Sequence, residues 1–258
     1  MLGAIVGDVV GSVYEHRPIK TKEFPLLTRS SRFTDDSVCT VAVADWLLAG
    51  GDPAAVLRRW CRRHPRAGYG GMFRQWIMSD DMPAYGSWGN GAPMRASPCG
   101  WLAASLDEVL AAAERATNVS HDHPEAVRGA RAVAAAVWWA REGRTPGEVR
   151  RAVAGRFGYD LDATVDEIRP GYGFDVSSAG TVPPALIAAF EAEDYEDAVR
   201  NAISLGGDAD TLACIAGAVA EPLFGVPPTL ATAVEARLGD DMRGVLARFR
   251  ARTGGTTV

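Results

Sequence analysis

Residues 32–48 have the sequence RFTDDSVCTVAVADWLL, in which two adjacent carboxylates, Asp35 and Asp36, come directly before a helical stretch that is apolar almost all the way round. A helix of that kind belongs in a protein core. Two like charges at its start cost several kcal/mol to bury unless water solvates them or a cation neutralises them. The stretch therefore predicts a buried helix whose first turn meets either water or a cation.

Helical periodicity dominates the rest of the chain, whereas the alternating Val, Ile and Thr runs of strands are almost absent. The Gly- and Pro-rich stretches between the periodic segments have the composition of loops rather than of flexible linkers. We therefore expect an all-α fold in a single domain, residues 1–258, with the last six residues, TGGTTV, disordered. The expected helices span residues 38–49, 101–116, 124–142, 146–156, 183–192, 195–205, 211–221 and 229–238, after a small-residue helix at the N-terminus.

The composition is that of a soluble globular protein, with 47% hydrophobic and 23% charged residues. A formal net charge of −5 argues against a broad surface for nucleic acid, which needs an excess of Lys and Arg. The cysteines have no C-x-x-C spacing and are expected to be reduced core residues. Because no run reaches the roughly 20 apolar residues of a membrane span and no leader pattern is present, we expect a cytoplasmic protein, and a monomer.

A second acidic stretch, residues 204–221, has the sequence SLGGDADTLACIAGAVAE and places Asp208, Asp210 and Thr211 before another strongly apolar helix. Carboxylate and hydroxyl oxygens are the ligands that Mg²⁺ and Mn²⁺ prefer. Helix capping is the simpler explanation for either cluster alone, because Thr, Ser and Asp cap helices and acidic groups suit the first turn. Each cluster has more oxygen atoms than one cap needs. If the two clusters face each other, their repulsion requires one or two divalent cations.

Two further stretches contain candidate functional groups. Residues 86–95, GSWGNGAPMR, have three glycines within six residues, so backbone N–H groups could turn toward a phosphate, although such loops are more often simple turns. Residues 3–15, GAIVGDVVGSVYE, place a glycine at every fourth position, a spacing that lets helices pack closely. This segment ends in Glu15, which could be an acid/base group.

Residues 120–126, SHDHPEA, place His121 and His123 two apart, just before Pro124. An H-x-H pair can bind zinc, but no third His or nearby Cys completes such a site. Capping of the following helix, or a contact with substrate, is the better interpretation.

Taken in order, the motifs FTDDS, GSWGNGAPMR, SHDHPEA and SLGGDADT resemble those of the ADP-ribosylglycohydrolase family, and the resemblance spans about residues 2–226. It implies a compact multi-helix orthogonal bundle with a cleft for ADP-ribose and a binuclear centre of two Mg²⁺ or Mn²⁺ ions. By motif position, the metal ligands would be Thr34, Asp35, Asp36, Asp208, Asp210 and Thr211. The substrate-binding residues would be Gly86, Ser87, Trp88, Gly89, Asn90 and Gly91 along the pyrophosphate, and His121 at the distal part of the ligand.

The resemblance implies hydrolysis of the C1″ glycosidic bond of an ADP-ribosylated protein or small molecule, with release of ADP-ribose. Because such cleavage passes through an oxocarbenium-like state, a carboxylate is expected to assist the leaving group or activate water, and Glu15 is a better candidate than Asp35 or Asp36. The alternative is a catalytically inactive module that only binds ADP-ribose. Diphosphate chemistry of the isoprenoid type is disfavoured because Ser37, Val38 and Cys39 follow the aspartate pair where a DDxxD run needs a third carboxylate.

Overall fold

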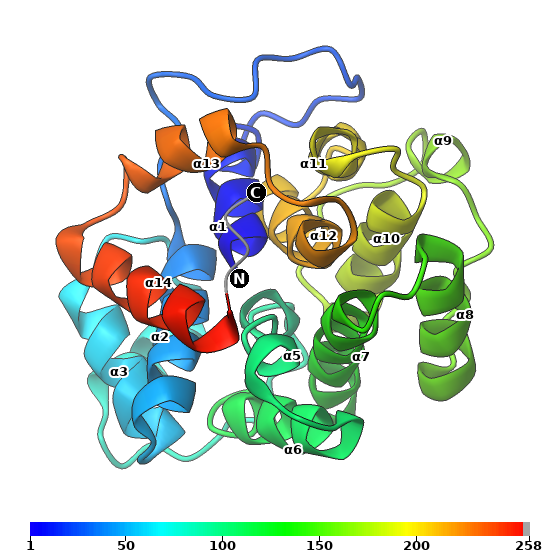
Figure 1. Ribbon diagram of the computed structural model, residues 1–258. Coiled ribbons are helices and arrows are strands. Elements are labelled where there is room, and N and C mark those ends of the chain that lie inside the picture. Colours follow the sequence, from blue (N-terminus) through cyan, green and yellow to red (C-terminus); the bar gives the residue numbers. More distant parts are fainter. Residues whose placement is uncertain (255–258) are drawn as a thin grey trace.

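The computed structural model describes residues 1–254, and within them it contains helices and no strand (Figure 1). The predicted all-α class is therefore confirmed. The helices, with one 3₁₀ turn (η1), are α1 (Leu2–Gly11), α2 (Asp35–Ala49), α3 (Pro53–Arg63), α4 (Gly71–Met78), η1 (Pro93–Arg95), α5 (Cys99–Leu102), α6 (Leu106–Thr117), α7 (Pro124–Arg141), α8 (Pro146–Phe157), α9 (Val165–Ile168), α10 (Ser178–Phe190), α11 (Tyr195–Ser204), α12 (Ala209–Phe224), α13 (Pro228–Glu235) and α14 (Asp240–Thr253).

Helices α1 and α12 pack against each other at the centre of the molecule (Figure 1). The glycines of α1 make this approach possible: a Cβ atom on Gly7 would lie 1.9 Å from the carbonyl oxygen of Ala213, and one on Gly11 would lie 2.5 Å from Cα of Asp210. The close packing predicted from the glycine spacing is confirmed. It brings the C-terminal half of α1 against the first turn of α12, where the second acidic stretch begins.

The other helices surround this central pair. Helices α2, α3 and α14 pack together on one side, α5 to α8 form a second group, and α10 and α11 cover α12 (Figure 1). The buried apolar side chains of the described residues form one cluster, and the single domain expected from the sequence stays a prediction. No helix of the described chain has the length and apolarity to cross a bilayer.

The predicted helix 101–116 is interrupted in the structure. Ala103 has an extended backbone, and Ser105 begins α6 by accepting a hydrogen bond from the N–H of Glu108. The short α5 packs so closely on α7 that a Cβ atom on Gly100 would lie 2.4 Å from the carbonyl oxygen of Ala134. Tertiary packing thus divides a stretch whose periodicity is continuous.

The four cysteines are free and buried, as predicted. At the C-terminus, the expected disordered tail begins at Thr253, but Thr253 is the last residue of α14 and Gly254 caps that helix in a left-handed conformation. The remaining part of this tail, residues 255–258, lies outside the described residues.

Candidate metal centre

The two acidic stretches meet. The carboxylates of Asp8, Asp36 and Asp210 each offer an oxygen within 4.8 Å of the others, and Glu15, Asp208 and Asp210 form a second such group. The hydroxyl of Thr211 also lies 3.4 Å from Oδ2 of Asp36. The convergence predicted for segments far apart in the sequence is therefore present, and Asp210 belongs to both groups.

Helix capping explains only part of this arrangement. Thr34 is the N-cap of α2, and its hydroxyl accepts a hydrogen bond from the N–H of Asp36 at 3.3 Å. Asp208 occupies the N-cap position of α12 but makes no side-chain capping bond. The carboxylates of Asp36 and Asp210 face each other within the first acidic group. Because two helices present carboxylates to a shared space, capping alone does not account for them.

Asp8, on α1, was not among the candidates from the sequence. It is fully buried, and it accepts hydrogen bonds from the N–H of Thr34 at 2.9 Å, the hydroxyl of Thr34 at 2.6 Å, the N–H of Ser37 at 3.1 Å and the hydroxyl of Ser37. Three of these donors bond to Oδ2 and one to Oδ1, so Asp8 orients the start of α2 and keeps an unused lone pair on Oδ1. A single acidic residue inside an otherwise apolar helix was the available signal in the sequence.

The carboxyl groups of this cluster are strongly perturbed. Burial raises the pKa of Asp8 to about 6, and burial together with the charge of Asp8 raises the pKa of Asp35 to about 7. Burial and then neighbouring carboxylates raise the pKa of Asp36 and of Asp210 well above the ordinary value. Such a cluster needs either protons or cations to be neutral.

One carboxylate oxygen of the cluster, on Asp36, indicates where a cation would bind. Oδ1 of Asp36 is buried and has no hydrogen-bond partner among the described residues. An ionised oxygen in that position is costly unless a cation meets it. The surrounding oxygen atoms belong to carboxylates and to the hydroxyls of Thr34 and Thr211, and oxygen ligands of these kinds suit Mg²⁺ or Mn²⁺. The residues present therefore fit a divalent metal site.

Asp35 and Glu15 lie at the edges of the cluster. Asp35 is half-buried and belongs to neither acidic group of the described chain; its Oδ1 faces Gly68, where a Cβ atom would lie at 3.2 Å. The Glu15 side chain, in the turn after α1, is 26% exposed and belongs to the second group. Burial raises the pKa of Glu15, His16 opposes this, and Asp208 adds to the rise. Of these two carboxylates, Glu15 has the closer contact with the α12 aspartates.

The glycine-rich loop is fixed to the metal centre through Asn90. Its side-chain amide donates to Oδ2 of Asp208 at 2.7 Å and to the hydroxyl of Thr181 at 3.1 Å. The resemblance placed Asn90 along the pyrophosphate, which stays a prediction; in the structure its side chain also holds an aspartate of the acidic cluster. The loop also pairs with the segment before α10, through an isolated bridge between Gly89 and Ser177.

Part of the loop backbone is already bonded. The N–H of Gly86 donates to Asp122, that of Gly89 to the hydroxyl of Ser87, and that of Asn90 to the carbonyl of Val176. Within residues 1–254, the N–H groups without an acceptor in this loop are those of Ser87, Trp88, Gly91 and Ala92. Trp88 is 52% exposed, and Phe174 and Val176, in or next to the segment that pairs with this loop, are also exposed.

The side chains of His121 and Arg95 contact this loop at Gly91. A Cβ atom on Gly91 would lie 3.0 Å from Nε2 of His121, while Nδ1 of that ring lies 2.8 Å from the hydroxyl of Ser120. Burial and then the charge of Arg95 lower the pKa of His121 well below the ordinary value, so the ring is neutral. Arg95, also buried, donates to the carbonyl of Gly91 at 2.9 Å. No role was predicted for Arg95.

His123 has the simpler of the two roles considered for the histidine pair. It is the N-cap of α7, and its Nδ1 accepts a hydrogen bond from the N–H of Glu125 at 3.2 Å. The capping interpretation is confirmed for this residue.

A model of the ADP-ribosylglycohydrolase family matches residues 1–255. The chain belongs to this family. An uncharacterized protein of Archaeoglobus fulgidus is 32% identical to this chain over 144 residues. The match covers 50% of this chain and 47% of that protein. The chain thus matches about half the length of that relative. An ADP-ribosylarginine hydrolase, Tri1, of Pseudomonas putida is 26% identical over 265 aligned residues, covering 88% of this chain and 70% of that protein.

The fold of this ADP-ribosylglycohydrolase family member is also found in a solved structure described as an ADP-ribosylglycohydrolase-related protein complex. The TM-score is 0.72 at 23% sequence identity, and the match covers 98% of this chain and 97% of that chain. At that identity the match supports the fold, and the expected bundle architecture is confirmed.

Proposed function

We propose that the protein is a Mg²⁺- or Mn²⁺-dependent hydrolase that cleaves the C1″ glycosidic bond of ADP-ribosylated acceptors and releases ADP-ribose. The observation that carries this proposal is the joint presentation of Asp36 and Asp210 by two distant helices, with Oδ1 of Asp36 buried and unpartnered among the described residues. Membership of the ADP-ribosylglycohydrolase family supports the reaction class.

The metal ligands in this proposal are Thr34, Asp36, Asp208, Asp210 and Thr211, with Asp35 at the edge. Because Asp210 belongs to both acidic groups, one side chain could serve two ions. Bound divalent cations would hold the ribose hydroxyls and increase the acidity of a water molecule beside the anomeric carbon. Asp8 and Asn90 position the ligands, through Thr34 and Asp208 respectively.

The acid/base role is assigned to Glu15. Its raised pKa lets the carboxyl hold a proton closer to neutral pH, and its partial exposure lets a substrate reach it. A protonated Glu15 can give its proton to the departing acceptor atom, and the resulting carboxylate can then accept one from water. Asp36 is buried within the acidic cluster, where a substrate reaches it less easily, so it is the weaker candidate for this task.

For the acceptor, we propose arginine. The support is the relative named as an ADP-ribosylarginine hydrolase. The exposed rings of Trp88 and Phe174, beside the glycine-rich loop, offer aromatic faces on which a guanidinium group or the adenine can stack. Ser87, Trp88 and Gly91, whose N–H groups have no acceptor within residues 1–254, are the proposed contacts for the pyrophosphate.

The test is to incubate the protein with peptides that contain ADP-ribosylarginine or ADP-ribosylserine, in the presence of Mg²⁺, Mn²⁺ or a chelator. The released ADP-ribose is measured by chromatography. We expect release from the arginine peptide that needs the metal and is abolished by Asp210→Asn. Tight, stoichiometric binding of ADP-ribose without release from either peptide would instead support the inactive binding module.

A further inference from the structure

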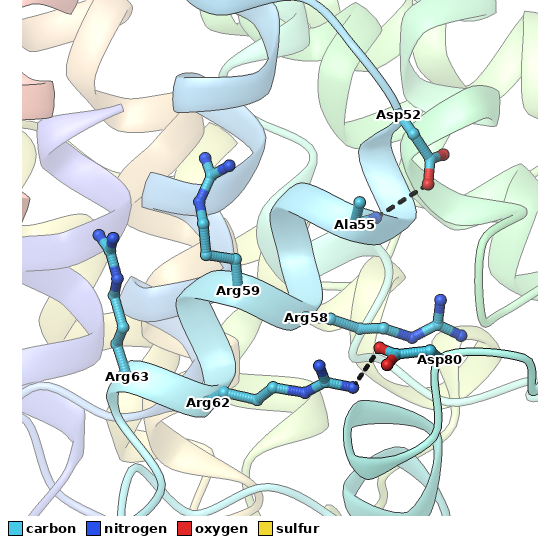
Figure 2. A pocket seen from close by; sticks show the side chains of 7 residues that line it. All are labelled: Asp52, Ala55, Arg58, Arg59, Arg62, Arg63 and Asp80. Carbon is cyan, nitrogen blue, oxygen red and sulfur yellow. Dashed lines mark hydrogen bonds and ion pairs between the residues drawn. The ribbon is translucent and has the colours of Figure 1, made fainter.

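An arginine-rich pocket lies along α3. None of its lining residues belongs to the two acidic groups of the candidate metal centre. Its volume is about 530 Å³, within the range of small-molecule sites. The pocket-lining arginines are Arg58, Arg59, Arg62 and Arg63. Arg58 and Arg62 extend toward Asp80 in the loop after α4, whereas Arg59 and Arg63 extend to the other side of α3 (Figure 2). Two carboxylates, Asp52 and Asp80, complete the charged lining. The lining therefore carries a formal charge of +2 (four Arg minus two Asp) on a chain whose net charge is −5.

We propose that this pocket is a second binding site, for a compact phosphate-bearing anion such as inorganic diphosphate or the diphosphate group of a nucleotide. The guanidinium group is suited to this class of ligand because its planar fork can donate two parallel hydrogen bonds to phosphate oxygens.

Arg58 is the fixed part of the site. It is 8% exposed and lies over the Trp76 ring, with 4.1 Å between the guanidinium carbon and the ring centroid. Nε donates to the carbonyl of Trp76 at 3.2 Å, and Nη2 to that of Met82 at 2.7 Å. Nη1 has no acceptor among the described residues and is not one of the fully buried unpaired atoms. A guanidinium held in this way loses little conformational entropy when an anion binds.

Arg62 provides the second fork, one helical turn further along the same face. Its Nε donates to the carbonyl of Ile77 at 2.7 Å, and its Nη2 to the carboxylate of Asp80 at 2.7 Å (Figure 2). Asp80 is 78% exposed, so this ion pair is weak. A dianionic or more highly charged phosphate group would outcompete one exposed carboxylate for Arg62.

Arg59 and Arg63 lie at the other side of the helix, and of the two only Arg63 adds an uncompensated charge (Figure 2). Arg59 is neutralised by Asp45 at 2.9 Å, whereas Arg63 has no carboxylate partner within residues 1–254. The pocket lining contains no aromatic ring, so a nucleobase would find nothing to stack on. This is why the phosphate part, rather than a whole nucleoside, is the recognised group.

The probe for this site is inorganic diphosphate, titrated calorimetrically into the full chain in chelator at low ionic strength. The chelator removes divalent cations, so the outcome is independent of the proposed metal chemistry. We expect one equivalent to bind, with an affinity that falls at least about tenfold in the Arg62→Gln/Arg63→Gln variant. The matched control is Arg151→Gln/Arg156→Gln on α8, which removes the same charge elsewhere and should leave the affinity within about twofold.

A second variant keeps the test decisive if the double variant folds poorly. Asp80→Asn removes the competing carboxylate, so it should tighten diphosphate binding several-fold, whereas purely structural arginines would predict no gain. Three outcomes would overturn the proposal: no binding by the wild-type chain, equal losses in the α3 and α8 variants, or binding of a glutamate-rich peptide in preference to diphosphate.

Discussion

At the scale of single residues, metal binding at the candidate centre depends on which oxygen atoms have lone pairs available to a cation. Asp8 shows this best, because its two oxygens accept hydrogen bonds from four donors of Thr34 and Ser37. The Thr34 hydroxyl gives its proton to Asp8, so the lone pairs of that hydroxyl remain available to a cation. Asp8 thus acts through Thr34, which makes it a positioning residue.

The substitution Asp8→Asn should test this role. The amide that replaces the carboxylate can accept at one end only, so one of the donors from Thr34 or Ser37 loses its partner. We expect a loss of about 1–3 kcal/mol in unfolding free energy and at least a tenfold weaker affinity for Mn²⁺, measured by denaturation and by calorimetry. Asp162→Asn, at an exposed position, should change neither quantity. An unaltered Mn²⁺ affinity in the Asp8 variant would show that Thr34 needs no orientation.

Glu15→Gln should separate chemistry from binding. The amide keeps the shape of the side chain but cannot exchange a proton, so kcat should fall about 10²–10⁴-fold at saturating metal, while KM for the ADP-ribosylated peptide changes little. Steady-state kinetics at several metal concentrations provide this comparison. If kcat recovers fully at high metal, Glu15 is only a weak metal contact and another group transfers the proton.

At the scale of elements, helical periodicity predicted most of the architecture, and tertiary contacts decided the rest. The apolar stretches became α2, α7, α10, α11 and α12 with ends shifted by a few residues. Helix α3 was missed although Val56, Leu57, Trp60 and Cys61 keep helical spacing, and α14 because its few apolar residues are interspersed with six charged ones. The backbone contact of α1 with α12 was foreseeable from glycine spacing, whereas the break between α5 and α6 was not.

Gly7→Ala tests the central helix pair. The added Cβ atom would lie 1.9 Å from a backbone oxygen of α12, so the helices must separate. We expect a loss of about 3 kcal/mol or more in unfolding free energy, and weaker metal binding because the acidic stretches move apart. Gly155→Ala on α8 is the control, since nothing lies within 4 Å of its Cβ position, and it should stabilise by about 0.5–1 kcal/mol. Equal effects of the two substitutions would contradict the close packing.

At the scale of the whole molecule, the site exists only because α1, α2, α12 and the glycine-rich loop come together. The motifs indicated which segments carry oxygen ligands, and the structure brings those segments into contact. The roles of Asp8, Asn90 and Arg95 could not be predicted, because each bonds to a partner from another element: Thr34, Asp208 and Ala116 respectively. The expected cytoplasmic location and monomeric state stay predictions.

The buried carboxyls should make stability depend on pH and metal together. In the metal-free protein, the raised pKa of Asp8, about 6, and of Asp35, about 7, means that the folded state keeps protons that the unfolded chain releases above about pH 4. Stability should therefore fall as pH rises from 5 to 8. Saturating Mg²⁺ should raise the Tm more at pH 8 than at pH 5, because cations replace the protons. Differential scanning calorimetry checks both statements, and a Tm that rises with pH without metal would contradict them.

The central claim is that oxygens from two distant stretches jointly bind divalent cations. Calorimetric titration of the metal-free chain with Mn²⁺, compared with its Asp210→Asn variant, tests it most directly, since Asp210 belongs to both acidic groups. The account predicts two equivalents bound by the wild-type chain and loss of both in the variant. Absence of Mn²⁺ binding by the folded wild-type chain, or undiminished binding by the variant, would contradict it.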